Sequence, residues 1–173
     1  QWFYGSGHPK LSYTTNFEPV KKQVTVTITQ MQVGQNYQFP LAIDVYENGK
    51  ASRKNVWVDA EEKNNFTFSV SKNPELVNIN ADGVLLGEFT DSKTADQYFT
   101  QFQNSKEFLS RYLAVENATE NVAKNPAFLK ILVAGLKDPN FRIRMKSLSG
   151  LDLAKPDQAK AALSEVEKMA AHN

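Results

Sequence analysis

Cysteine is absent from the 173-residue chain, and histidine occurs only twice, at His8 and His172. The absence of cysteine excludes disulfides, thiolate metal sites and cysteine nucleophiles. A catalytic zinc ion usually takes about three protein ligands from His, Glu, Asp or Cys, so two histidines at opposite ends of the sequence predict no metal site. No apolar run approaches the roughly 20 residues of a membrane-spanning helix, and no membrane span is expected.

The chain also has no large excess of positive or negative charge, because it contains 20 Lys and Arg residues and 19 Asp and Glu residues. A balanced chain of this kind offers no field that would attract nucleic acid, which is therefore not an expected partner. Hydrophobic residues make up 41% and charged residues 23% of the chain, as in folded proteins. The sequence begins at Gln1 without a methionine, and we interpret it as a piece of a longer protein.

Residues 1–90 show the two-residue periodicity of β-strands. In QVTVTITQ, Val24, Val26 and Ile28 alternate with threonines, which predicts a strand with one buried face. The Asn48-Gly49 pair between two such segments is typical of a two-residue hairpin. About seven short strands at regular spacing predict an antiparallel β-sandwich. The segments are KLSYTTNF, QVTVTITQ, FPLAIDVY, NVWVDA, FTFSV, ELVNIN and VLLGEF.

Residues 91–173 change to helical periodicity, so the chain is predicted to be multidomain, with a β domain over 1–90 and an α domain over 91–173. Asp91 or Ser92 is expected to cap the first helix, and Asn125 is expected to cap a later one. Short connections predict that successive helices are antiparallel. Several apolar residues at helical spacing are expected to be buried: Tyr98, Phe99, Phe102, Phe108, Leu109, Tyr112, Leu113, Phe128, Leu129, Leu132, Val133, Leu136, Ala162, Leu163, Val166 and Met169.

One helix connection has a recognisable pattern. The stretch L-x-x-G-L-K-D-P-N-x-x-x-R, from Leu132 to Arg144, resembles the hinge between the helices of HEAT repeats. In this interpretation Asp138 caps the second helix and Arg144 reaches back toward the turn. The alternative is a plain helical bundle with an Asp-Pro turn.

Candidate catalytic residues are few. Ser6 and His8 could be read as nucleophile and base, but a spacing of two residues is not the geometry of a catalytic triad. The sequence contains no G-x-S-x-G, no H-E-x-x-H and no phosphate-binding loop. The paired carboxylates at 61–62 and at Glu165 with Glu167 are expected to be solvated surface. No catalytic, cofactor-binding or metal-binding residue is predicted, and the chain is not expected to be an enzyme by itself.

The order of several segments resembles the region that follows the catalytic domain in M1-family zinc aminopeptidases. These segments are QWFYGSGHPKLSYTTNF, KQVTVTITQMQ, YQFPLAIDVYENG, NVWVD, FTFSV and NADGVLLGEF. In that family a Q-W-[aromatic/aliphatic]-x-x-x-G-x-P motif leads into a small Ig-like β-sandwich, and a helical domain of HEAT or armadillo type comes next. The resemblance covers Gln1 to about Phe89 in motif detail and rests on architecture beyond that point.

This resemblance implies a non-catalytic C-terminal portion of a larger zinc-dependent aminopeptidase. The family's H-E-x-x-H with a downstream Glu, and its G-x-M-E-N loop, match no position here, so zinc is expected only in the catalytic domain of the longer protein. The sandwich would space that domain from the helical domain, which would gate the access of peptide substrate. The implied partners are therefore the catalytic domain in cis and the peptide substrate.

The first residues are predicted to pack against that catalytic domain or to fold back on the sandwich. Trp2, Phe3 and Tyr4 are too apolar to lie in water, and His8 follows them at the junction. An alternative function is a free-standing module in which the sandwich binds a carbohydrate or protein ligand and the helices act as a scaffold. Such a module should expose an aromatic platform, for which Trp57 with Tyr46 is the candidate.

Overall fold

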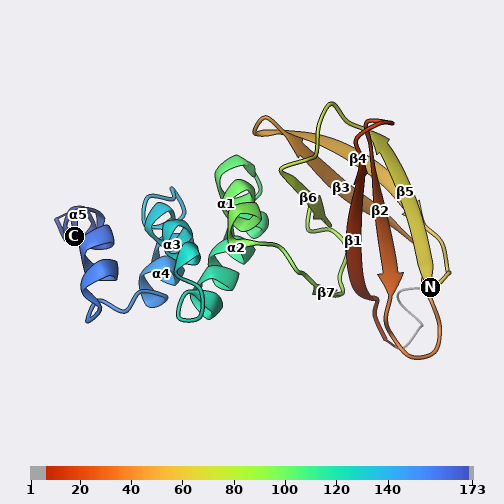
Figure 1. Cartoon of the computed structure of the whole chain (residues 1–173). Helices are drawn as coiled ribbons and strands as arrows, with labels where there is room; N and C mark the ends of the chain where they lie inside the picture. Colours follow the sequence, from red (N-terminus) through yellow and green to blue (C-terminus); the bar gives the residue numbers. More distant parts are fainter. Residues whose placement is uncertain (1–6, 172–173) are drawn as a thin grey trace. The chain divides into compact units, whose positions relative to one another are not determined.

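The computed structural model describes residues 7–171 and has a β region followed by a helical region, which is the predicted order (Figure 1). The chain divides into two compact units, with the boundary between Ser92 and Lys93. Each unit has its own hydrophobic core, and each is described separately below.

Seven strands of the described residues form two sheets in the first unit. They are β1 (Lys10–Glu18), β2 (Gln23–Gln30), β3 (Phe39–Glu47), β4 (Lys50–Val58), β5 (Lys63–Ser69), β6 (Leu76–Ile79) and β7 (Glu88–Thr90). One sheet has the order β5-β2-β1-β7 and the other has the order β4-β3-β6. The strand pairs are antiparallel, as expected, except that β7 runs parallel to β1.

The inner faces of the two sheets make the sandwich core. In β2 the predicted inward residues Val24, Val26 and Ile28 are buried, because successive side chains of a strand point to opposite faces. The alternation in FPLAIDVY predicts that Phe39, Leu41, Ile43 and Val45 face inward, and all four are buried. The opposite face of β3 is also buried over most of its length. The core residues come chiefly from β2, β3 and β6: Leu11, Val24, Val26, Ile28, Phe39, Leu41, Ile43, Val45, Val58, Val70, Val77 and Ile79.

The last predicted strand is much shorter than the segment VLLGEF. The side chain of Asn80 forms two hydrogen bonds with the main chain of Leu85. Its Oδ1 accepts the Leu85 N–H and its Nδ2 donates to the Leu85 carbonyl, both at 3.0 Å. These bonds use main-chain groups that a strand ladder would need. Val84 and Leu86 consequently lie in an exposed loop, and β7 begins only at Glu88.

The second unit contains five α-helices and one short 3₁₀ helix among the described residues. They are α1 (Ala95–Asn104), α2 (Phe108–Asn121), η1 (Pro126–Phe128), α3 (Leu129–Gly135), α4 (Phe141–Ser149) and α5 (Pro156–Ala170). α1 packs on α2 and α3, α4 packs on α2 and α3, and α5 packs on α3. This packing is common to a repeat array and to a plain bundle. None of these helices is long and apolar enough to cross a membrane.

The start of α1 differs from the prediction. Thr94, rather than Asp91 or Ser92, is the N-cap, because its hydroxyl accepts the N–H of Gln97 and the Gln97 side chain accepts the N–H of Thr94. This reciprocal pair is a capping box. The predicted cap at Asn125 is confirmed, since its Oδ1 accepts the N–H of Ala127 at 3.0 Å.

The buried face of α2 was predicted wrongly. The helix buries Ser110, Ala114, Val115 and Ala118, whereas Phe108, Leu109 and Leu113 are between 36% and 46% exposed. Close helix crossings explain the difference, because they admit only small side chains. A Cβ on Gly150 at the end of α4 would lie 2.6 Å from Oγ1 of Thr119 on α2.

The remaining apolar predictions for the helices are mixed. Tyr98 and Phe102 of α1 are buried, and Phe99 and Tyr112 pack partly against the same core, as expected. In α5 the buried residues are Gln158 and Ala162, while Leu163 faces solvent and Val166 and Met169 are only partly covered.

Candidate functional site

Of the residues predicted to contact a catalytic domain, only His8 can be placed. Trp2, Phe3 and Tyr4 lie outside the described residues, as does Ser6, the residue considered as a nucleophile. The imidazole of His8 is about half exposed, at 48%, and its Nε2 donates to Oε1 of Glu88 at 2.6 Å. The structure therefore gives His8 a carboxylate partner on β7.

His8 and Glu88 meet because β1 and β7 are paired at their first residues. Lys10 lies opposite Glu88 in the parallel register, and its Nζ is 3.0 Å from the second carboxylate oxygen, Oε2. The hydrogen bond from His8, and after it that from Lys10, lowers the pKa of Glu88 below its ordinary value. Gly87 permits the close approach, since a Cβ at that position would lie 2.7 Å from the carbonyl oxygen of Pro9.

Exposed apolar side chains flank this charged cluster. The N–H of Met31, which follows β2, donates to the carbonyl of Lys10 at 2.7 Å, and Leu86 precedes Glu88 by two residues. Both apolar side chains are more than half exposed. We refer to His8, Lys10, Met31, Leu86 and Glu88 as the junction surface.

The aromatic platform predicted for a free-standing binding module is absent from the described sandwich. Trp57 is 56% exposed, but Tyr46 is 1% exposed and cannot offer a ring face to a ligand. In the β3–β4 ladder Trp57 lies opposite Pro40, whereas Tyr46 lies opposite Ala51, near the other end of the strand pair. The two rings are therefore not neighbours.

No group of three or more His, Cys, Asp or Glu side chains within residues 7–171 is arranged to hold a metal ion. Of the paired carboxylates expected at the surface, Glu61, Glu62 and Glu167 are exposed, as predicted.

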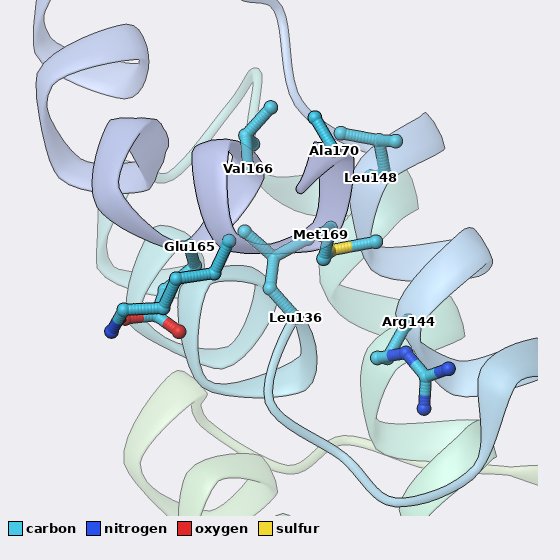
Figure 2. A pocket seen from close by; sticks show the side chains of 8 residues that line it. Leu136, Arg144, Leu148, Glu165, Val166, Met169 and Ala170 are labelled. Atoms are coloured by element: carbon cyan, nitrogen blue, oxygen red, sulfur yellow. The ribbon is translucent and has the colours of Figure 1, made fainter. Parts of the chain in front are cut away.

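The helical unit has a pocket of about 570 Å³ beside α5 (Figure 2). Its apolar part is formed by Leu136, Leu148, Val166 and Met169. Figure 2 shows Arg144 at one side of this apolar group and Glu165 at the other. Sequence analysis did not identify this pocket, because its lining comes from three separate helical segments.

Glu165 is not solvated surface, contrary to the prediction. Its side chain is only 13% exposed, and Oε1 lies 2.9 Å from Nζ of Lys168 and 3.3 Å from Nζ of Lys137. The hydrogen bond from Lys168 lowers the pKa of Glu165, with a smaller contribution from Lys137. The carboxylate thus joins α5 to the end of α3 and carries no unpaired charge into the pocket.

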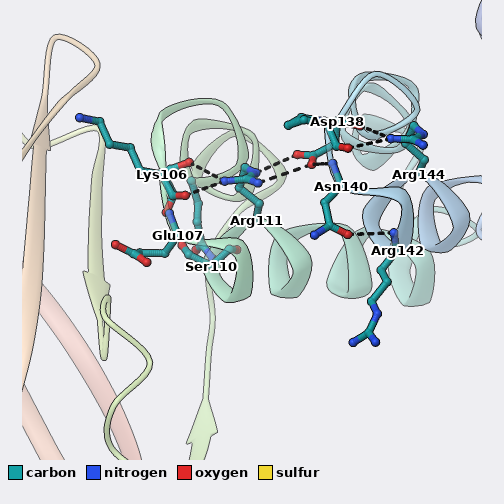
Figure 3. A network of polar contacts seen from close by, with 11 residues as sticks. Lys106, Glu107, Ser110, Arg111, Asp138, Asn140, Arg142 and Arg144 are labelled. Atoms are coloured by element: carbon teal, nitrogen blue, oxygen red, sulfur yellow. Dashed lines mark hydrogen bonds and ion pairs between the residues drawn. The ribbon is translucent and has the colours of Figure 1, made fainter.

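A polar network surrounds the turn between α3 and α4 (Figure 3). The carboxylate of Asp138 is almost fully buried, and it accepts Nε of Arg111 from α2 and the N–H of Asn140, each at 2.8 Å. Arg144 reaches back from α4, as predicted, and its Nη1 donates to the carbonyls of Asp138 and Pro139 at 2.9 Å.

One role in this network was assigned to the wrong residue. The N-cap of α4 is Asn140, whose Oδ1 accepts the N–H of Arg142 at 2.9 Å, and Asp138 does not cap the helix. Asp138 instead stabilises the turn before the cap and binds Arg111. Arg111 was missed because its partner lies 27 residues away in the sequence.

Comparisons with known proteins give a structural likeness. No family profile and no curated protein matches the sequence. Among solved structures, the crystal structure of Legionella pneumophila aminopeptidase A in complex with aspartic acid matches 97% of this chain with a TM-score of 0.68 and 17% sequence identity. The chain covers 22% of that protein. At this identity the likeness shows the fold alone, which is similar to that of a portion of an aminopeptidase.

Proposed function

We propose that the chain is a non-catalytic part of an M1-type zinc aminopeptidase. The observation that carries the proposal is the likeness of nearly the whole chain, β unit and helical unit together, to a portion of one aminopeptidase. The order of segments between Gln1 and Phe89, which resembles the M1 family, supports the same assignment independently of the structure.

In this proposal the sandwich spaces the catalytic domain from the helical unit. The junction surface faces the catalytic domain, because it lies where the described chain enters β1 and combines exposed Met31 and Leu86 with the paired charges of Lys10 and Glu88. The zinc ion is held by the catalytic domain of the longer protein, since the sequence here contains no H-E-x-x-H.

The helical unit restricts the access of peptide to the active site. Such a role requires a stiff array of helices, which the buried pair between Arg111 and Asp138 favours. The paired carboxylate of Glu165 stiffens the attachment of α5 in the same way.

The coding sequence upstream of the Gln1 codon tests the proposal directly. We expect an open reading frame that encodes G-x-M-E-N and then H-E-x-x-H with a downstream Glu. A start codon or a signal peptide immediately before Gln1 would contradict the assignment and leave a separate binding module.

The junction surface can be tested in the full-length protein. Replacing Met31 and Leu86 together by Asp places two charges against the catalytic domain, so we expect aminopeptidase activity to be lost at a lower temperature. The control is Val20→Asp, which alters a more fully exposed apolar residue in the turn at the opposite end of β1. Equal thermal inactivation of the two variants would show that the junction surface does not face the catalytic domain.

A further inference from the structure

The hairpin between β3 and β4 presents two main-chain N–H groups to one carboxylate. Asn48 and Gly49 both have positive φ angles, of 53° and 71°. The N–H of Asn48 donates to Oε1 of Glu75 at 3.0 Å, and the N–H of Gly49 donates to Oε2 at 2.9 Å. Successive N–H groups in a turn form a concavity that binds anions, and here the anion is a side chain of the same unit.

Glu75 is held in this position by its own contacts. Its N–H donates to the carbonyl of Tyr46 at 2.9 Å, and Nζ of Lys72 lies 3.0 Å from Oε1. A second carboxylate makes the reverse connection, since Oε1 of Glu47 accepts the N–H of Ser71 at 2.7 Å and its hydroxyl at 2.6 Å. The hairpin and the 71–75 loop are thus joined by two carboxylates, one from each side.

Asn-Gly is the dipeptide whose sequence is most favourable for spontaneous cyclisation, because glycine has no side chain to obstruct the reaction. The nitrogen of Gly49 gives its proton to a base in solution and forms a bond to Cγ of Asn48. The amide nitrogen Nδ2 then takes a proton from the solvent, the bond between Cγ and Nδ2 breaks, and ammonia leaves. Water opens the resulting cyclic imide and yields aspartate or isoaspartate.

We propose that Asn48 is a site of isoaspartate formation, and that Glu75 slows this reaction in the folded protein. The reacting nitrogen must lose its proton, and in the folded hairpin that proton is donated to a carboxylate. The negative charge of Glu75 also disfavours an amide anion at the same position. The side-chain amide of Asn48 is exposed and has no hydrogen-bond partner among residues 7–171. Protection therefore depends on the nitrogen of Gly49.

Modification of Asn48 would break the hydrogen bonds that join the hairpin to Glu75. Isoaspartate lengthens the main chain of the turn by one carbon and moves both N–H groups out of the geometry that binds Glu75. Either product also adds a negative charge beside Glu75 and Glu47. The hairpin would then be repelled from the 71–75 loop.

The test compares the rate of product formation at Asn48 in the wild-type chain and in Glu75→Ala. Samples are incubated at mildly alkaline pH, and the peptide containing Asn48 is followed by mass spectrometry and by chromatographic separation of the isoaspartyl form. Losing a hydrogen bond to a charged group should accelerate the reaction by about tenfold or more. The wild-type chain unfolded in urea should react at least as fast as the variant.

Two control variants separate this effect from general loosening. Glu62→Ala removes a carboxylate from another turn and should leave the rate unchanged. Glu47→Ala removes the reverse connection but keeps Glu75 on the turn, so it should accelerate the reaction much less than Glu75→Ala. Equal rates in Glu75→Ala and the wild type, or equal acceleration in Glu47→Ala and Glu75→Ala, would overturn the proposal.

Discussion

In the helical unit, Nε of Arg111 donates a hydrogen bond of 2.8 Å to Oδ2 of Asp138 and joins α2 to the turn between α3 and α4 (Figure 3). The same guanidinium donates through Nη1 to the carbonyl of Lys106, also at 2.8 Å, before α2 begins. Arg111 therefore links the segment before α2 to the turn between α3 and α4. The side chains of Arg111 and Asp138 are 17% and 2% exposed, so water competes little for these bonds.

Asp138→Ala should strongly destabilise the helical unit. The substitution leaves the guanidinium of Arg111 mostly covered without its counterion and removes the acceptor of the Asn140 N–H. Removing one partner of a buried ion pair lowers the free energy of unfolding by about 3 kcal/mol. Urea unfolding followed by far-ultraviolet circular dichroism measures this loss.

The control for Asp138→Ala is Lys155→Ala. Lys155 lies 4.0 Å from Asp152, and both side chains are at least half exposed. An exposed pair of this kind contributes between about 0 and 1 kcal/mol. If Asp138→Ala cost no more than Lys155→Ala, the network at the turn would not stabilise the unit.

Gly135→Ala should also destabilise the helical unit, because α3 and α4 cross closely at this residue. A Cβ on Gly135 would lie 2.0 Å from Oγ of Ser147 and 3.2 Å from Cγ2 of Val115. Overpacking of this type typically costs about 1 to 3 kcal/mol. The same urea unfolding experiment measures the change.

Ser147→Ala provides the matched variant for this crossing. The hydroxyl of Ser147 is buried and has no hydrogen-bond partner in the described part of the chain, so its removal should leave the free energy of unfolding unchanged or raise it slightly. The double variant should be more stable than Gly135→Ala alone, because the shortest contact is gone. Strict additivity of the two changes would contradict a direct contact.

The capping box at the start of α1 gives a further prediction. Thr94→Ala removes the acceptor of the Gln97 N–H and should lower the free energy of unfolding by about 1 kcal/mol. Ser92→Ala alters one of the two residues, Asp91 and Ser92, that the sequence offered as the cap and should have little effect. A larger loss in Ser92→Ala than in Thr94→Ala would contradict the observed helix start.

The sandwich could be predicted from the sequence where one strand carries its own pattern. Val24, Val26 and Ile28 are buried as the alternation in β2 requires, and the Asn48-Gly49 turn has the two positive φ angles of a two-residue hairpin. The burial of Tyr46 could not be predicted in this way. Alternation tells which residues share a face of a sheet, but not whether other parts of the protein cover that face.

The helical unit was less predictable because helix packing depends on pairs of elements. The large apolar residues of α2 suggested its buried face, but Gly150 and Thr119 set the approach of α4, and the sequence of one helix does not contain that information. The candidate site shows the same limit. The pattern D-P-N-x-x-x-R revealed Arg144, which binds the turn six residues before it, but gave no signal for Arg111.

Acid should weaken the sandwich through the two carboxylates that join the hairpin to the 71–75 loop. Hydrogen bonds from Ser71 lower the pKa of Glu47, and the N–H of Gly49 followed by Nζ of Lys72 lowers the pKa of Glu75, both below the ordinary value of 4.5. A group whose pKa is lower in the folded state stabilises that state above its unfolded pKa. This contribution is lost as the pH falls below 4.5 and through the folded pKa values.

Urea unfolding at a series of pH values, followed by tryptophan fluorescence, tests this dependence, since Trp57 lies on β4 of the first unit and residues 93–173 contain no tryptophan. The double variant Glu47→Gln with Glu75→Gln cannot titrate at these positions, so its stability should fall less steeply with acid than that of the wild type. Glu62→Gln, which alters a turn carboxylate outside the connection, should retain the wild-type slope. Because Glu88 also has a lowered pKa, some acid dependence should persist in the double variant.

Identical slopes in the double variant and the wild type would show that Glu47 and Glu75 do not link protonation to the folding of the sandwich.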